Sequence, residues 1–452
     1  MDVNDIRDIV EDLNFLIAKK DDSMIRNILV GLHPADVAEI IHYLSHEDKH
    51  YIFSLLDADF ASEVISELDD VSLDKILDDL DENRITEIVD EMDSDDATDL
   101  VAELPEEVAH KVLQRIDKED SEEVLELIRH EEDTAGGIMA KEYIAVNQNM
   151  TVEQVIQQIR SQAEEVEDLY NIWVVDEDQK LVGTVTLKDL ILADSKTVIS
   201  EIMDSDVISV TPDVDQEEVA RITQKYDLVS LPVVDDEGHL VGRITFDDVA
   251  DVAEEEASED FQRMAGIADE EEFRETSILK ISRARLPWLM VAFAGEMVSA
   301  FTLSRFEASL SQIIAAAFFI PIIMAMGGNA GIQSSTIMVR GMATGEIDLF
   351  EIRRRLVREI FVSMLNGFLC GLFLFGVVSI FLGQPRFGLL LGSVLFVVIM
   401  SATFVGAFIP VMLRKINIDP AISTGPFITT WNDVVGLLIY LGLITIFLPY
   451  LS

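Results

Sequence analysis

One aspartate stands inside the last apolar stretch of the chain. Asp433 lies about two helical turns into residues 426–451, which are apolar enough to cross a bilayer. A carboxylate at that depth is costly, so it is expected to have a function. The alternative is a buried ion pair, but no Lys or Arg occurs at comparable depth in any apolar stretch. Asp433 is therefore the leading candidate for an ion-binding side chain.

Polar residues and glycines also interrupt a second apolar stretch, residues 313–339. It contains the run Gly327-Gly328-Asn329-Ala330-Gly331-Ile332-Gln333-Ser334-Ser335-Thr336. Such residues are tolerated at membrane depth where they are buried in protein or line a wet cavity. Close helix packing through the glycines explains them equally well. Glu296, in the first apolar stretch, also lacks an evident partner, and a packing or interface role suits it as well as a functional one.

Carboxylate, carbonyl, amide and hydroxyl oxygens are the ligands that hard cations prefer. The apolar stretches contain no His, and the only cysteine, Cys370, lies within one of them, so a soft-metal site is disfavoured. Mg²⁺ releases its water reluctantly and is usually held through few carboxylates. Because one Asp433 is little charge for a dication, a homodimer with two copies on a shared axis would suit it.

Five apolar stretches are long enough for membrane helices. They are residues 286–304, 313–339, 360–382, 387–413 and 426–451. The flanking Lys and Arg residues gather on one side, and the opposite loops hold only Arg305 and Arg386. Positive charge marks the cytoplasmic side, so we expect a multi-pass cell-membrane protein with its N-terminus inside and its C-terminus outside. The first thirty residues contain no apolar signal core, so no cleavable signal peptide is expected.

The net charge of −51 is distributed very unevenly. From Leu279 onwards 12 basic residues accompany 8 acidic ones, so that part carries +4 and residues 1–278 carry −55. An acidic soluble part, cytoplasmic by the orientation above, thus precedes an apolar membrane part. A surface this anionic repels phosphates, which excludes nucleic acid as a partner.

Apolar residues recur every twelve positions in the N-terminal part. They are Leu32, Leu44, Leu56, Leu68, Leu80, Met92, Leu104, Ile116 and Ile128. An apolar pair such as Ile40-Ile41 follows eight or nine residues after each, and helix-start signals such as His33-Pro34 lie between them. The pattern predicts an all-α superhelical stack with one short helix for every twelve residues.

Residues 138–260 contain two copies of one pattern. Gly183, Thr186 and Asp189 recur as Gly242, Thr245 and Asp248, in the spacing Gly-x-x-Thr-x-x-Asp. Short β-branched runs followed by helical patterns indicate α/β units. The pair resembles tandem CBS modules, which bind adenine nucleotides in many proteins and serve only as dimerisation elements in others. An acid-rich helical stretch, residues 247–275, joins this part to the first apolar stretch and is placed to couple motion between them.

The order of these parts resembles the MgtE family of magnesium channels over essentially the whole chain. The most specific pieces are Gly-Gly-Asn-Ala-Gly-Ile-Gln, residues 327–333, and the Asp-Pro-Ala, Gly-Pro and Asp of residues 419–433. The resemblance implies a multidomain membrane protein that is homodimeric in lipid. Its parts would be an acidic helical-repeat domain in residues 1–134, tandem CBS modules in 135–250, a linker (plug) helix in 251–284 and a five-helix transmembrane domain in 285–452.

The resemblance also implies a function. The chain would be a Mg²⁺-selective uptake channel that intracellular Mg²⁺ closes. The matching pore positions are Asp433, Gly328, Asn329, Thr336 and Thr429. Two departures, Ile332 and Gly425, replace pore asparagines of many relatives and remove amide ligands, so passage of other divalent cations stays open.

Further positions match the family's regulatory sites. Acidic residues that would bind intracellular Mg²⁺ are Asp95, Asp99, Asp215, Glu217, Asp227, Asp248, Asp251, Glu256, Glu259, Asp260 and Asp419. Divalent ions that bridge such surfaces favour the compact state that they bind best. ATP is expected in the CBS pair at Tyr170, Lys188 and Asp189, although some relatives carry Arg at the position of Lys188.

Two other functions compete with the channel. One is a membrane-tethered sensor that binds divalent cations without conducting them. The other is an ion-coupled carrier, because one intramembrane carboxylate can also carry a proton. An enzyme is not expected, since the chain has no P-loop, no nucleophile motif and no catalytic cluster among its 7 His residues.

Overall fold

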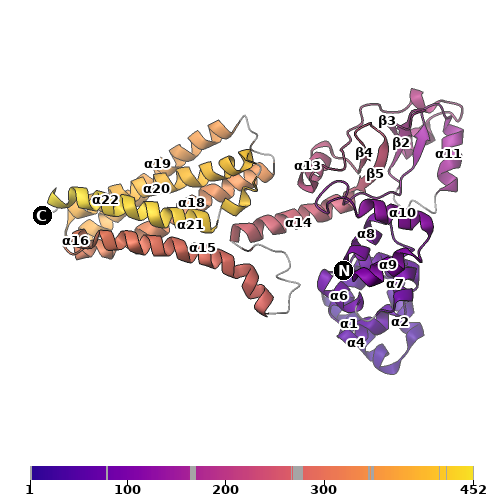
Figure 1. Ribbon diagram of the computed structural model, residues 1–452, viewed down its shortest axis with the longest axis horizontal. Helices are drawn as coiled ribbons and strands as arrows, with labels where there is room; N and C mark the ends of the chain where they lie inside the picture. Colours follow the sequence, from indigo (N-terminus) through magenta and orange to yellow (C-terminus); the bar gives the residue numbers. More distant parts are fainter. Residues whose placement is uncertain are drawn as a thin grey trace. The chain divides into compact units, whose positions relative to one another are not determined.

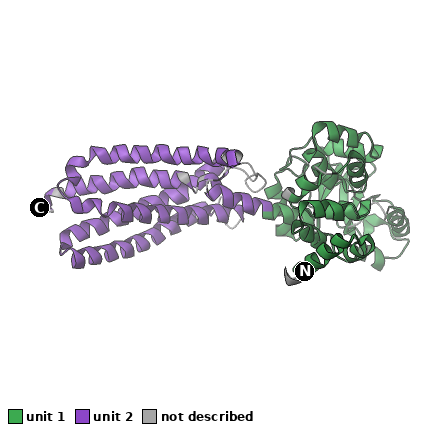
Figure 2. Ribbon diagram, turned by 90° about the horizontal axis from the view of Figure 1, so that it is seen from below, with its two compact units in different colours: residues 1–254 green, residues 255–452 purple. Residues whose placement is uncertain are grey.

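The computed structural model describes residues 3–77, 80–162, 169–265, 267, 278–344, 347, 351–416, 418–423 and 425–450. The chain divides into two compact units, residues 1–254 and 255–452 (Figure 2). The predicted linker helix, residues 251–284, lies partly outside the described residues.

The first unit begins with α1 (Val3–Lys19) and α2 (Asp22–Leu29), followed by eight short helices (Figure 1). These are α3 (Pro34–His42), α4 (His46–Phe53), α5 (Ala58–Ser66), α6 (Asp70–Leu77), α7 (Glu82–Val89), α8 (Ser94–Glu103), α9 (Glu106–Leu113) and α10 (Lys118–Leu127). Each begins twelve residues after the one before, which confirms the predicted repeat. The apolar pairs, such as Ile40-Ile41 and Ile52-Phe53, are fully buried. Every second helix packs together, α3 on α5, α5 on α7 and α7 on α9.

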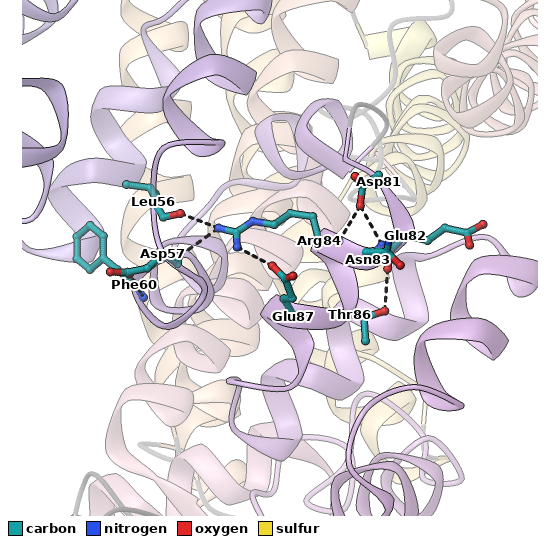
Figure 3. A network of polar contacts seen from close by, with 9 residues as sticks. All are labelled: Leu56, Asp57, Phe60, Asp81, Glu82, Asn83, Arg84, Thr86 and Glu87. Carbon is teal, nitrogen blue, oxygen red and sulfur yellow. Dashed lines mark hydrogen bonds and ion pairs between the residues drawn. The ribbon is translucent and has the colours of Figure 1, made fainter. Parts of the chain in front are cut away.

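Polar side chains fix the turns between these helices (Figure 3). The Asp81 carboxylate accepts the backbone N–H groups of Asn83 and Arg84 and so caps the start of α7. Arg84 donates from Nη2 to the carbonyls of Leu56 (2.8 Å) and Asp57 (3.2 Å), which lie between α4 and α5. Many of the acids in this part are therefore helix caps and structural partners.

The two CBS-like copies form two small sheets. The strands β1 (Ala145–Asn147), β2 (Asn171–Val175) and β3 (Leu181–Thr186) make one sheet, and β4 (Ser230–Val234) and β5 (Leu240–Thr245) make the other. The accompanying helices are α11 (Val152–Ser161), α12 (Leu187–Leu192), the short η1 (Ile199–Glu201), α13 (Gln216–Tyr226) and α14 (Phe246–Ala265). The β2–β3 and β4–β5 hairpins share one register and a bulge at the same point.

A methionine of each CBS-like copy packs against a glycine of the other copy. The thioether of Met203 packs against Gly183, and that of Met139 packs against Gly242, where any side chain would collide. The Thr and Asp of the repeated motif cap a helix in each copy. Thr186 is paired with Asp189 at α12, and Thr245 with Asp248 at α14. The motif is therefore first of all a folding device, in line with the predicted α/β pair.

The second unit contains five helices that are long and apolar enough to cross a membrane, among the residues described. They lie within α15 (Ile278–Arg305), α17–α18 (Ile314–Ala317 and Ile320–Ala343), α19 (Ile352–Phe381), α20 (Pro385–Lys415), and a composite of α21 (Pro426–Trp431), η4 (Asn432–Gly436) and α22 (Leu437–Phe447). Short α16 (Glu307–Leu310), η3 (Ala421–Ser423) and η5 (Leu448–Tyr450) complete it. The five predicted spans are confirmed, but the third helix begins at Ile352 rather than 360 because its charged segment continues the helix.

Glycines allow the membrane helices to touch backbone to backbone. Gly331 of α18 faces Gly406 of α20, and Gly371 of α19 faces Gly392 of α20, so that a Cβ at any of these positions would meet main-chain atoms. Close approach through small residues is the usual way in which membrane helices pack. The predicted packing role of glycines in residues 327–331 is therefore correct for Gly331.

Candidate metal centres

Asp433 lies in η4, a single π-helical turn inside the fifth membrane helix. Such π turns re-aim side chains and occur often at functional sites. The preceding residue, Asn432, is 2% exposed, and its Nδ2 donates to the Met324 carbonyl of α18 at 2.8 Å. Its carboxamide fits because Gly327 and Gly436 leave space where a side chain would collide with or crowd Oδ1. Oδ1 itself has no hydrogen-bond partner among the residues that the structure describes.

Asp433 has a second carboxyl group as its neighbour. The side chain of Glu296, from α15, is hydrogen-bonded to it, and Asn432 Nδ2 lies 3.5 Å from Asp433 Oδ1. Sequence reasoning noticed Glu296 but gave it no role, and it missed Asn432. The polar run from Thr429 to Asp433 was a signal for Asn432, yet nothing in the sequence shows that this amide points into α18.

The other predicted pore residues lie on α18 and α21. Gly328 is buried, and a Cβ there would stand 3.7 Å from Asn432 Nδ2. Asn329 is exposed and Thr336 half-buried, and their spacing with exposed Gln333 places all three on one face of α18. Thr429 is exposed and donates from Oγ1 to the Gly425 carbonyl at 3.3 Å. Only Gly328 is thus joined to Asp433 by a described contact, through Asn432.

A second group of carboxylates forms in the first unit, where α8 meets the start of the first CBS copy. Carboxylate oxygens of Asp93, Asp95 and Glu142 lie within 4.8 Å of one another. Glu142 accepts the backbone N–H (3.1 Å) and the hydroxyl (2.9 Å) of Ser94, so a carboxylate from outside the helix caps α8. Glu142 and Asp93 were absent from the predicted sensor, and their separation in sequence by about 50 positions explains the omission.

Burial and mutual repulsion raise the pKa values of Asp95 and of three nearby carboxyl groups, Asp96, Asp248 and Asp251. Burial raises the pKa of Asp95 well above its usual value, and Asp248 of α14 adds to the effect. Burial raises the pKa of Asp96 despite a hydrogen bond from Ser66, and the pKa of Asp248 rises to about 6 despite the bonds from Thr245. The pKa of Asp251 is raised by burial and then by Asp247. Carboxylates that repel one another in this way are a site for cations.

The other sensor candidates of the first unit lie elsewhere. Asp99 is exposed on α8. Asp215 caps α13 by accepting the backbone N–H of Glu217 at 3.0 Å, and both residues are exposed. Asp227 has left-handed backbone (φ 52°) at the other end of α13. These four residues are not among the groups that shift the pKa of Asp95 or Asp248 most.

The second unit has a smaller group at the end of α14. The pKa of Asp260 is raised to about 6, mainly by burial and further by repulsion from the carboxylates of Asp419 and Glu256. Arg263, which sequence reasoning missed, donates from Nη1 to Asp419 Oδ2 at 2.7 Å and pairs with Glu259. The other oxygen of Asp419 accepts the backbone N–H of Ala421 at 2.7 Å. An arginine thus already occupies carboxylates that were predicted to bind Mg²⁺.

A pocket of about 590 Å³ lies in the CBS pair. Its lining residues are Tyr170, Thr223, Gln224, Asp227, Leu228, Val229, Phe246 and Asp247. Of the predicted nucleotide residues, only Tyr170 lines it. Lys188 is exposed on α12, and Asp189 is engaged with Thr186, whose hydroxyl donates to it at 2.5 Å.

Three family models match successive parts of the chain. Residues 320–443 match a family described as divalent cation transporter (MgtE), residues 32–133 match the MgtE intracellular N domain, and residues 135–196 and 199–255 match CBS domains. The chain is 42% identical over 315 residues to the magnesium transporter MgtE of Thermus thermophilus, covering 70% of both chains. It is 36% identical to the magnesium transporter MgtE of Bacillus subtilis, covering 71% of both.

Two solved structures resemble the soluble part. One is the cytosolic domain of the Mg²⁺ channel MgtE in complex with ATP, with 39% identity, a TM-score of 0.51, and coverage of 54% of this chain and 99% of that one. The other is the soluble part of a magnesium transporter, with 29% identity, a TM-score of 0.52, and coverage of 56% and 99%.

Proposed function

The chain belongs to the MgtE family of magnesium transporters, which are not enzymes, and on that premise we propose that it is a Mg²⁺ channel closed by intracellular Mg²⁺. The path passes Asp433, and the acidic cytoplasmic unit is the sensor. Asp433 carries the transport proposal, because a carboxylate held in a π turn of a membrane helix serves little purpose unless an ion meets it.

The path is formed where the fifth membrane helix meets α18. Asp433 supplies charge, and the exposed face of α18 with Asn329 and Thr336 supplies oxygens for a hydrated ion. Gly328 and Thr429 contribute further oxygen ligands at a similar depth in the membrane. Two copies in a homodimer place two Asp433 carboxylates on one axis, which doubles the charge offered to the dication. The N-terminus is cytoplasmic and the C-terminus lies outside.

The sensor works by relief of repulsion. The pKa values of Asp95, Asp96 and Asp248 are raised because these half-buried carboxylates lie close together, so bringing them together costs free energy without a cation. Intracellular Mg²⁺ binds among them, together with Asp251 and Glu142, and favours the compact state. Asp99, Asp215, Glu217 and Asp227, and the second-unit acids Glu256, Glu259, Asp260 and Asp419, stay proposed secondary ligands.

ATP binds in the pocket of the CBS pair. The similar cytosolic domain was solved with ATP, and this pocket offers an aromatic face at Tyr170 and Phe246 for the base. Asp227 and Asp247 are placed to accept ribose hydroxyl groups, as acidic residues do in other nucleotide sites. Exposed Lys188 of α12 stays a candidate for the phosphates, and Asp189 stays a candidate for the nucleotide only if its hydrogen bond with Thr186 is released.

A flux assay with the purified full-length chain in liposomes tests this proposal. Mg²⁺ entry is expected when the acidic unit faces magnesium-free buffer, and it is expected to stop when that buffer contains millimolar Mg²⁺. Absence of flux under both conditions would favour a tethered sensor. Flux that requires a proton or sodium gradient would favour a coupled carrier.

A further inference from the structure

We propose that Glu296 is a second anionic side chain of the ion path, which together with Asp433 determines its preference for divalent over monovalent cations. The proposal rests on the proposed function and assigns a specificity-determining role to a residue of α15. It starts from the hydrogen-bonded contact between the Glu296 and Asp433 carboxyl groups.

The backbone, rather than a flexible side chain, brings Glu296 to this place. α15 packs against both α21 and η4. At the crossing, Gly295 faces Thr430 so closely that a Cβ would lie 2.9 Å from Thr430 Oγ1 and 3.1 Å from its Cβ. Thr430 and Asp433 are three positions apart and share a helix face. The residue after Gly295 is therefore held beside Asp433.

A buried amide at the same place provides a second, independent observation. Asn432 is 2% exposed, and within the described part of the chain its Oδ1 has no hydrogen-bond partner. Its Nδ2 lies 3.5 Å from the Asp433 carboxylate, so the amide belongs to the same group of polar atoms. Because Oδ1 lies against Gly327 and Gly436 while Nδ2 faces Asp433, this buried amide holds the Asp433 carboxylate in place beside α18.

The physical consequence is a stronger field for divalent ions. Two carboxyl groups in contact repel when both are ionised, and a cation between them removes that repulsion. In a homodimer, Glu296 raises the number of carboxylates near the path from two to four. Because Coulomb attraction scales with the charge of the ion, the added carboxylates stabilise a dication more than a monovalent cation. Removal of Glu296 should therefore weaken Mg²⁺ binding and reduce discrimination against Na⁺, without closing the path.

The test uses the full-length chain in liposomes, with the acidic unit facing magnesium-free buffer. Variants are E296Q, E296D and D433N, with E307Q on α16 as the matched control at an exposed acid of the same unit. Mg²⁺ influx is measured against external Mg²⁺ concentration and in competition with Na⁺. For E296Q we expect the half-saturating Mg²⁺ concentration to rise about 5-fold and the Mg²⁺-to-Na⁺ flux ratio to fall by about as much. E296D should restore most of both values.

The outcomes separate the two proposals. If D433N abolishes flux while E296Q behaves like E307Q in both measurements, Glu296 has no part in specificity, and the proposed function stands. If D433N conducts normally, the path does not pass Asp433, and both proposals are overturned. A loss of E296Q flux without a change in half-saturation or in ion preference would indicate a structural role and would also overturn the inference. Size-exclusion profiles that match the parent chain exclude misfolding as the cause.

Discussion

The acidic site of the membrane unit and that of the soluble unit lie in opposite surroundings, because charge is rare in the first unit and abundant in the second. In the membrane unit, Asp433 and Glu296 are two carboxyl groups among apolar helices. In the soluble unit, Asp95, Asp96 and Asp248 are a small selection from a part of the chain that contains 76 acidic residues before Leu279. The first site is conspicuous because any charge is rare there. The second is distinguished only by burial.

This difference has a physical consequence for each site. A membrane carboxylate faces a large desolvation cost whatever its neighbours are, so its presence already argues for a function. In the soluble unit most acids are solvated or cap helices, as Asp81 and Asp215 do. Repulsion becomes significant where α8, Glu142 and α14 bring carboxylates together, and again around Glu123 of α10. Residue type identifies the first site, and three-dimensional arrangement identifies the second.

Removing the charge of Asp433 should have the largest effect of the changes that test this comparison. Asp433→Asn keeps the volume and a hydrogen-bonding side chain but removes one charge per chain. We expect Mg²⁺ flux in liposomes to fall by about 100-fold, which corresponds to roughly 2.7 kcal/mol. The matched Glu307→Gln variant should conduct normally. Normal flux in Asp433→Asn would mean that this carboxylate is merely a packing residue.

The soluble site should show the converse behaviour, with flux kept and its regulation lost. In the double variant Asp95→Asn and Asp248→Asn, the buried repulsion that a cation relieves is gone. The Mg²⁺ concentration on the acidic side that halves the flux should rise about 10-fold, or roughly 1.4 kcal/mol of binding free energy. Asp74→Asn, at an exposed acid of α6, is the control. An equal response of the two variants would remove α8 and α14 from the sensor.

A smaller effect on inhibition by Mg²⁺ is expected at Arg263, whose positive charge occupies the place of a metal ion. Arg263 holds Asp419 and Glu259, and this pair is partly exposed, so its contribution is modest. Arg263→Gln leaves Asp419 and Glu259 without this cation, next to Asp260. Mg²⁺ should then bind there more tightly, and the half-inhibiting concentration in the flux assay should fall about 3-fold. A rise instead would show that Arg263 stabilises the closed state rather than competing with Mg²⁺.

Much of this architecture was predictable, and the failures have a common cause. The twelve-residue period gave the helix starts from α3 to α10 correctly because apolar spacing and capping residues act locally. The five spans followed from length and hydropathy. Glu142, Asn432 and Arg263 were missed because their importance comes from partners far along the chain: Ser94, Met324 and Asp419 respectively. Local patterns carry no information about such contacts.

The last and smallest effect tests whether the soluble site is strained without metal. The folded-state pKa values of Asp95, Asp96 and Asp248 lie above the unfolded value of 3.8, so the folded form binds protons first and stability should rise as the pH falls from 7.5 to 5.5. Groups with lowered pKa values, such as Asp69 and Asp235, lose their contribution only below about pH 4 and do not interfere. A pKa shift of one unit is about 1.4 kcal/mol, which corresponds to about 3–6 °C in a domain of this size.

Trp173 allows this measurement in the full chain. It is fully buried in β2, and the other two tryptophans, Trp288 and Trp431, can be replaced by Phe. In EDTA, the Trp173 fluorescence midpoint should rise by roughly 5 °C between pH 7.5 and pH 5.5. With saturating Mg²⁺ the rise should vanish, because the metal already neutralises the carboxylates and protons must displace it. The Asp95→Asn and Asp248→Asn double variant should show a smaller rise in EDTA, and the part that remains comes from Asp96, Asp251 and Glu123, whose pKa values are also raised. A midpoint that falls with pH in EDTA would mean that these carboxylates are not strained, and that soluble and membrane sites differ less than their arrangement suggests.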